Sequence, residues 1–114
     1  MSDCLFCKII EGSIDAKCVY EDEHVLAFND INPQAPLHIL IIPKKHIATI
    51  NDIFPEDVET IGSMSLAAAK IAEQEGVADK GYRTVVNCGE GAGQTVFHLH
   101  MHILAGRSLA WPPG

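Results

Sequence analysis

The sequence has 114 residues, 47% of them hydrophobic, and eight Lys and Arg against fifteen Asp and Glu give a formal net charge of −7. This length predicts one domain spanning residues 1–114, and the acidic balance argues against nucleic acid or an anionic membrane as a partner. No apolar run approaches a membrane span and the start lacks a signal-peptide pattern, so we expect a cytoplasmic protein whose four cysteines are thiols or metal ligands.

The first half of the chain predicts a short helix followed by three strands. Residues 3–12 (DCLFCKIIEG) read as a helix that Asp3 caps and Gly12 closes. Residues 17–23 and 24–30 form a predicted hairpin, and the prolines in 31–36 indicate a loop. Residues 38–44 (HILIIPK) are apolar enough to be a central strand, which Pro43 ends.

The second half predicts one long helix and two more strands. Pro55 suits the first helical turn and Gly76 the end, and small residues along the helix allow close packing on the sheet or on a second copy of the chain. Its predicted apolar side comprises Val58, Ile61, Met64, Leu66, Ala68 and Ile71. Strands are predicted at 82–88 and 95–106, with a glycine-rich loop between them. We therefore expect an α+β fold, a five-stranded antiparallel sheet with one long and one short helix.

Three histidines alternate with apolar residues near the end of the chain. His98, His100 and His102 are interleaved with Phe97, Leu99, Met101 and Ile103, which is the period of a β-strand. In a strand the three imidazoles would share one face and the apolar residues would face the core. The alternatives are an ordinary half-buried strand with its polar residues outward, or two ligands of a metal site that takes its third from elsewhere.

The glycine-rich loop GEGAGQ directly precedes these histidines. Three glycines, Gly89, Gly91 and Gly93, allow successive N–H groups to point into one concavity that binds an anion, while the alternative is a flexible connection. Gln94 and Thr95 add side-chain donors between the loop and the histidines, so a phosphate is the natural ligand. A neutral imidazole can attack phosphorus without a metal ion, and a second histidine can stabilise the charge that develops.

The motif HLHMHILA resembles the signature of the histidine triad (HIT) superfamily. The segments FCKIIEGSI, AFNDINPQAPLHILIIPKKHI, GYRTVVNCGEGAGQTVFHLHMHILAGR and WPPG resemble its Hint branch, the nucleoside phosphoramidate hydrolases, over nearly the whole chain. The resemblance implies a homodimeric HIT-like fold that binds purine nucleoside monophosphates. It also implies cleavage of adenosine 5′-phosphoramidates through a covalent nucleotidyl-histidine.

Roles for individual residues follow from the resemblance. His100 would be the nucleophile, His102 would bind the phosphate or the bridging atom, and His98 would orient His100. Contacts to the nucleotide would come from Phe6, Ile9, Phe28, Asp30, Ile31, Asn87, Gly93, Gln94 and Thr95, with Asp30 on the ribose hydroxyls and the apolar members around the base. Asp30 can also be read as a turn residue, and Phe6, Ile9 and Phe28 as plain core. His38 would be a second-shell partner of the triad or a buried, hydrogen-bonded histidine.

Cys4 and Cys7 form a Cys-x-x-Cys motif in the predicted first helix. Resemblance to zinc-containing members of the superfamily adds His46 and His98 as further ligands. Such a Cys₂His₂ set suits structural zinc, with no metal needed for the chemistry; the alternative is two thiols on a helix face. Cys18 and Cys88 are expected to be small buried hydrophobes. Trp111 matches a tail that in the Hint branch reaches the partner's site, or it pins the tail to the surface.

Three other functions compete with phosphoramidate hydrolysis. A nucleotide-binding regulatory or adaptor protein would have little need of an intact triad. A nucleotidyl transferase needs a second substrate pocket, for which 114 residues leave little room. A dinucleoside polyphosphate hydrolase would be expected to carry more Lys and Arg near the triad than Arg83 and Arg107.

Overall fold

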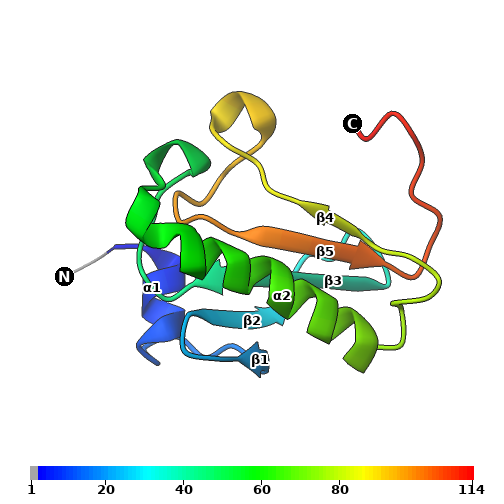
Figure 1. The fold of residues 1–114 in the computed structure, drawn as a ribbon, viewed down its shortest axis with the longest axis horizontal. Coiled ribbons are helices and arrows are strands. Elements are labelled where there is room, and N and C mark those ends of the chain that lie inside the picture. Colours follow the sequence, from blue (N-terminus) through cyan, green and yellow to red (C-terminus); the bar gives the residue numbers. More distant parts are fainter. Residues whose placement is uncertain (1–2) are drawn as a thin grey trace.

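A computed structural model describes residues 3–114 and shows an open five-stranded antiparallel sheet with a helix across one face (Figure 1). The strands are β1 (Cys18–Glu21), β2 (Val25–Asn29), β3 (Leu37–Pro43), β4 (Arg83–Val85) and β5 (Met101–Ala105), in the order β1-β2-β3-β5-β4. The helices are α1 (Leu5–Ile10) and α2 (Val58–Gln74), and 3₁₀ turns span Ile50–Asp52, Pro55–Asp57 and Glu90–Ala92. The predicted α+β class, the hairpin and the central position of β3 are confirmed.

The two helices cover opposite faces of the sheet. Alternate residues of the central strands pack with the buried side of α2 in the larger core, which includes Val25, Ala27, Ile39, Ile41, Met64, Ile71 and Ile103. The other face carries a smaller core with Phe6 of α1 and the strand residues Leu26, Phe28, Leu40 and Ile42. Because His102 pairs with Leu40 across β5 and β3, its side chain lies on the α1 face of the sheet. The histidines of interest therefore lie opposite α2.

Several predicted boundaries are wrong. The α-helix begins at Val58 after the 3₁₀ turn, and Val58 and Leu66 of the predicted apolar side are 66% and 57% exposed. The Sγ atom of Cys4, and not Asp3, caps α1 by accepting the N–H of Cys7 at 3.4 Å. Both glycines expected to end helices adopt positive φ angles, 87° at Gly12 and 76° at Gly76, as left-handed helix ends require.

Two cysteines are less buried than expected. Cys18 is exposed at the start of β1, and Cys88 is partly exposed next to the glycine-rich loop. Neither is the fully buried apolar residue that the sequence predicted. No helix among residues 3–114 has both the length and the apolar character needed to span a membrane.

Candidate active site

The histidine segment is a strand only in its second half. Residues 94–100 lie outside the sheet, and β5 begins at Met101, so the prediction of three imidazoles on one continuous strand is wrong. The physical reason is a long-range contact: the N–H of Leu99 donates to the carbonyl of Ile47 at 2.6 Å instead of joining the ladder. Phe97 is consequently 48% exposed, whereas the side chain of His98 is fully buried.

His100 is held in one tautomer by its own chain. Its Nδ1 lies 2.8 Å from the carbonyl oxygen of His98, which can only accept, so Nδ1 carries the proton. The lone pair is then on Nε2. The ring of Phe6 packs edge-on against the His100 ring, with centroids 5.2 Å apart, and the residue is 8% exposed. The structure therefore presents an immobilised imidazole with an unprotonated Nε2, as a nucleophile requires.

His102 is held in the opposite tautomer, through a hydrogen bond to His38. The backbone N–H of Gln34 donates to Nδ1 of His38 at 3.0 Å, which puts the His38 proton on Nε2. That nitrogen lies 2.9 Å from Nδ1 of His102 and 3.4 Å from the carboxylate of Asp30. His102 Nδ1 accepts, so its own proton is on Nε2. The rings of His100 and His102 are 5.1 Å apart between centroids, which places an acceptor and a donor side by side.

Burial keeps His102 and His38 neutral. Loss of hydration and, to a smaller extent, the neighbouring His100 and His38 lower the pKa of His102 to about 4, against an opposing effect of the Asp30 carboxylate. Burial also lowers the pKa of His38, while the carboxylate of Asp30 raises it in part. At neutral pH the relay from Gln34 to His102 therefore carries no charge.

We expect the free energy of unfolding to decrease as the pH falls from 6.5 towards 4. A histidine in the unfolded chain takes up its proton near pH 6.5, whereas folded His102, with a pKa of about 4, does so only at lower pH. Protons therefore favour the unfolded chain in this window and cease to do so below it. Urea unfolding should show a loss on the order of 2 kcal/mol between pH 7 and pH 4.5.

Two substitutions identify the source of this pH dependence. His102→Gln should flatten the decrease, and His24→Gln, at a partly exposed histidine beside Glu59, should not. A free energy of unfolding that stays constant or rises on acidification would contradict the proposed titration.

The glycine-rich loop is closed by its own hydrogen bonds. Gly89 and Gly93 have φ angles of 87° and 95°, but the N–H groups of Ala92, Gly93 and Gln94 donate to carbonyls inside the loop. The predicted concavity of free N–H groups is therefore largely absent among these residues. The side chain of Gln94 accepts from the N–H of Gly89 at 2.8 Å and donates to the carbonyls of Ala48 and Val96 at 2.8 and 3.0 Å. Gln94 fastens the loop and does not supply the free donors expected of it.

The remaining nucleotide-contact candidates differ in burial. Thr95 and Gly93 are exposed and Asn87 is partly exposed. The side-chain nitrogen of Asn87 lies next to Gly93, 4.0 Å from the point where a Cβ atom on that glycine would be. Phe6 and Phe28 belong to the smaller core at 4% and 6% exposure. Ile9 is partly buried beside them, Asp30 is partly exposed at the end of β2, and Ile31 projects fully into solvent.

Cys4, Cys7, His46 and His98 meet in one cluster, although they come from three separate segments. One ligand atom from each lies within 4.8 Å of all the others. The proton on Nε2 of His98 is donated to the carbonyl of Pro43 at 2.8 Å, which turns the Nδ1 lone pair towards the cluster. His98 and His102 thus belong to two different clusters, and the triad does not surround one metal position.

The spacing of this cluster fits a tetrahedral zinc ion. Zinc–nitrogen and zinc–sulfur bonds of about 2.0–2.1 and 2.3 Å put two nitrogens about 3.3 Å apart and a nitrogen and a sulfur about 3.6 Å apart. Nδ1 of His46 and of His98 are 3.1 Å apart. Sγ of Cys7 is 3.2 Å from His46 Nδ1 and 3.6 Å from His98 Nδ1, and Sγ of Cys4 is 3.3 Å from His98 Nδ1. These four residues could hold a metal.

Sequence reasoning missed the backbone groups that fix the imidazoles. The N–H of Gln34 and the carbonyls of Pro43 and His98 set the three tautomers, and no side-chain pattern signals them. It also missed the packing of Phe6 against the rings of His98 and His100. The place of Phe6 between the two predicted cysteine ligands was the available signal.

The fold and the paired histidines agree with a match to a protein family. The family model of the HIT domain matches residues 11–109, and the chain belongs to this family. It is 54% identical over 112 residues to a HIT-like protein of Synechococcus elongatus described as uncharacterized, covering 98% of this chain and 97% of that protein. It is 52% identical over 105 residues to the purine nucleoside phosphoramidase of Escherichia coli K12, covering 92% and 88% of the two chains. Among solved structures, a HIT family hydrolase from Legionella pneumophila has a TM-score of 0.96 at 54% identity, covering 98% of this chain and all of that one.

Proposed function

We propose that this protein hydrolyses purine nucleoside 5′-phosphoramidates, with His100 as the nucleophile. The observation that carries the proposal is the pair of opposite tautomers, an unprotonated Nε2 on His100 beside a protonated Nε2 on His102. A phosphoryl group between them would meet a nucleophile on one side and a hydrogen-bond donor on the other. The identity to the Escherichia coli purine nucleoside phosphoramidase supports this class of substrate.

The reaction has two displacements at phosphorus. Nε2 of His100 forms a bond to the α-phosphorus while the phosphorus–nitrogen bond breaks. The substrate nitrogen enters protonated and leaves as a neutral amine, and the Nε2–H of His102 donates a hydrogen bond to the phosphoryl oxygen. Water then attacks the phosphorus and releases the nucleoside monophosphate from His100. Because its pKa is lowered to about 4, His102 stays neutral at neutral pH and serves as a hydrogen-bond donor in both displacements.

The contacts around the two histidines suit a nucleotide. We assign Asp30 to the ribose hydroxyls, since its carboxylate is partly exposed at the end of β2 and lies 3.4 Å from His38. Thr95 and Asn87 are assigned to the phosphate side, Gln94 to the loop that carries Thr95, and Ile9, Phe28 and Ile31 to the base. Phe6 backs the ring of His100.

A structural zinc ion and a homodimer belong to the same proposal. Zinc held by Cys4, Cys7, His46 and His98 would fasten α1 behind His100 and take no part in the chemistry. A homodimer would cover the exposed apolar side chains of Val58 and Leu66 on α2 and of Phe54 just before it. Sedimentation velocity showing only a monomer at micromolar concentration would contradict the dimer.

The adduct on His100 tests the function directly. Incubation with adenosine 5′-phosphoramidate, an alkaline denaturing quench and intact-mass spectrometry should show a gain of one adenylyl group, and peptide mapping at alkaline pH should place it on His100. His100→Asn should form no adduct, and His24→Asn should form it normally. Turnover without an adduct on any histidine would overturn the covalent route, and binding without turnover would favour the regulatory alternative.

A further inference from the structure

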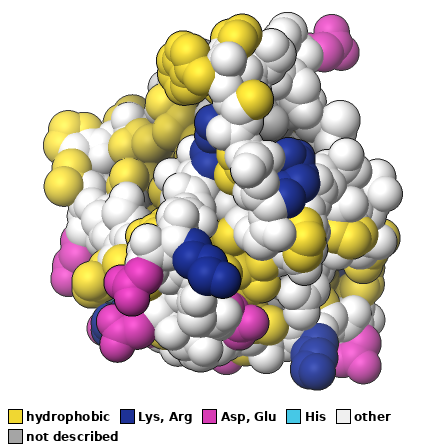
Figure 2. Space-filling view, turned by 90° about the vertical axis from the view of Figure 1, so that its right-hand side faces the viewer, with side chains coloured by type: hydrophobic (Ala, Val, Ile, Leu, Met, Phe, Trp, Pro, Cys, Tyr) yellow, Lys and Arg dark blue, Asp and Glu magenta, His cyan; other side chains and the backbone are white. Residues whose placement is uncertain are grey.

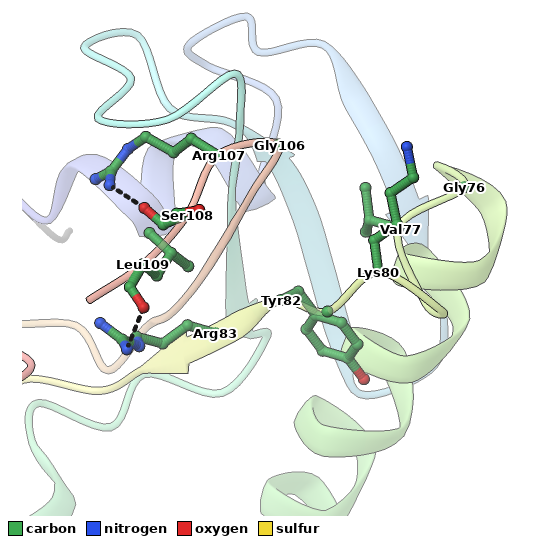
Figure 3. A pocket seen from close by; sticks show the side chains of 10 residues that line it. Gly76, Val77, Lys80, Tyr82, Arg83, Gly106, Arg107, Ser108 and Leu109 are labelled. Atoms are coloured by element: carbon green, nitrogen blue, oxygen red, sulfur yellow. Dashed lines mark hydrogen bonds between the residues drawn. The ribbon is translucent and has the colours of Figure 1, made fainter. Parts of the chain in front are cut away.

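A hollow lies at the end of the molecule where α2 meets β4 (Figures 2 and 3). It has a volume of about 600 Å³ and is lined by residues in 76–83 and 106–109. Pockets for small ligands commonly have this size. It shares no lining residue with the histidine site, which faces the α1 side of the sheet.

The lining carries an excess of positive charge. Lys80 and both arginines of the chain, Arg83 and Arg107, line the hollow, and none of its ten lining residues is acidic. Within residues 3–114 no carboxylate forms an ion pair with these three side chains, whereas Lys44 and Lys45 are paired with acidic residues. Three uncompensated cations in one concavity are unexpected in a chain of net charge −7.

Hydrogen bonds to backbone carbonyls fix both guanidinium groups and leave some of their N–H groups available to a ligand. Arg83 donates through Nη2 to the carbonyls of Leu109 and Ala110 at 3.3 and 2.9 Å. Arg107 donates through Nε to Gln34 and through Nη1 to Ser108, at 3.1 and 3.0 Å. A guanidinium has five N–H groups, so each arginine keeps donors for a ligand. In Figure 3 both arginines lie on the side of Ser108 and Leu109, and Lys80 stands across from them.

We propose that this hollow binds a small molecule with two or more oxyanion groups, phosphates or carboxylates. Two fixed guanidinium groups recognise planar or tetrahedral oxyanions, and Lys80 supplies a charge for a second group across the hollow. The site is also linked to the histidines, because Arg107 holds the carbonyl of Gln34, whose N–H fixes His38. The inference does not depend on the proposed phosphoramidate chemistry.

Titration calorimetry of the full chain with tripolyphosphate and with citrate, at constant low salt, tests the proposal and separates the two oxyanion classes. Lys80→Gln should weaken binding about 3- to 5-fold, and Arg107→Gln about tenfold or more. Lys70→Gln, at an exposed lysine of α2 outside the hollow, should leave binding unchanged. Since Lys80 makes no hydrogen bond or ion pair within the described chain, its loss should not disturb folding.

His100→Asn distinguishes this hollow from the histidine site. Binding that survives His100→Asn and weakens with Lys80→Gln supports the proposal, and whichever anion binds more tightly identifies the ligand class. No saturable binding of either anion up to about 10 mM would overturn it. Equal effects of Lys80→Gln and Lys70→Gln, or abolition by His100→Asn, would overturn it as well.

Discussion

Replacing His100 with asparagine is expected to lower kcat/KM for adenosine 5′-phosphoramidate by at least about 10⁴-fold, since removing a catalytic nucleophile can cost about 10⁶-fold. The asparagine amide can still donate to the carbonyl of His98, as Nδ1 of His100 does at 2.8 Å. The variant therefore keeps the local hydrogen bond and loses the Nε2 lone pair, together with the ring contact to Phe6. The folded structure should be unchanged.

The experiment is a steady-state assay of released AMP, with unfolding measured in parallel. His24→Asn is the matched control, because it removes an imidazole that is paired with Glu59 and takes no part in the triad. It should retain nearly full activity. If His100→Asn keeps more than about a tenth of the activity, a nucleophilic role for His100 is wrong, since removing a nucleophile costs far more.

The parts of the fold that local patterns determine could be predicted. The β1–β2 hairpin, the central β3 and the long helix follow from alternation, turn residues and apolar spacing, and each is present. The start of β5 could not be predicted, because the pattern of residues 95–106 is continuous. Only the contact between Leu99 and Ile47, 52 positions apart, shows that the ladder begins at Met101.

The candidate site shows the same division. The sequence indicated which imidazoles matter, but their tautomers depend on backbone groups of Gln34, Pro43 and His98 that a side-chain pattern does not encode. Gln94 was expected to donate to a ligand, and its donors instead bond to Ala48 and Val96. The basic hollow had no sequence signal, since pairing of β4 with β5 and the chain that follows bring Arg83 and Arg107 together.

Loss of the metal cluster is expected to have the largest effect on stability. The helix α1 has six residues, too few to be stable by itself, and its Phe6 fills the smaller core. Zinc bound by Cys4, Cys7, His46 and His98 would fasten this helix to two distant segments, so binding would contribute to folding. The double variant Cys4→Ser, Cys7→Ser should lose zinc and about 3–5 kcal/mol, comparable to the loss of a buried phenylalanine.

The zinc content is measured by elemental analysis and the free energy of unfolding by urea titration, both on protein purified without a His-tag. The wild-type chain should carry about one zinc ion, from the one four-ligand Cys₂His₂ set found within residues 3–114. Cys18→Ser, at an exposed cysteine, should keep both the metal and the stability. Well under one zinc ion per chain in the wild type, with an unchanged free energy of unfolding in the double variant, would contradict the site. Since the carbonyl of His98 holds Nδ1 of His100, a chain without the metal should also turn over more slowly while its His102 titration stays the same.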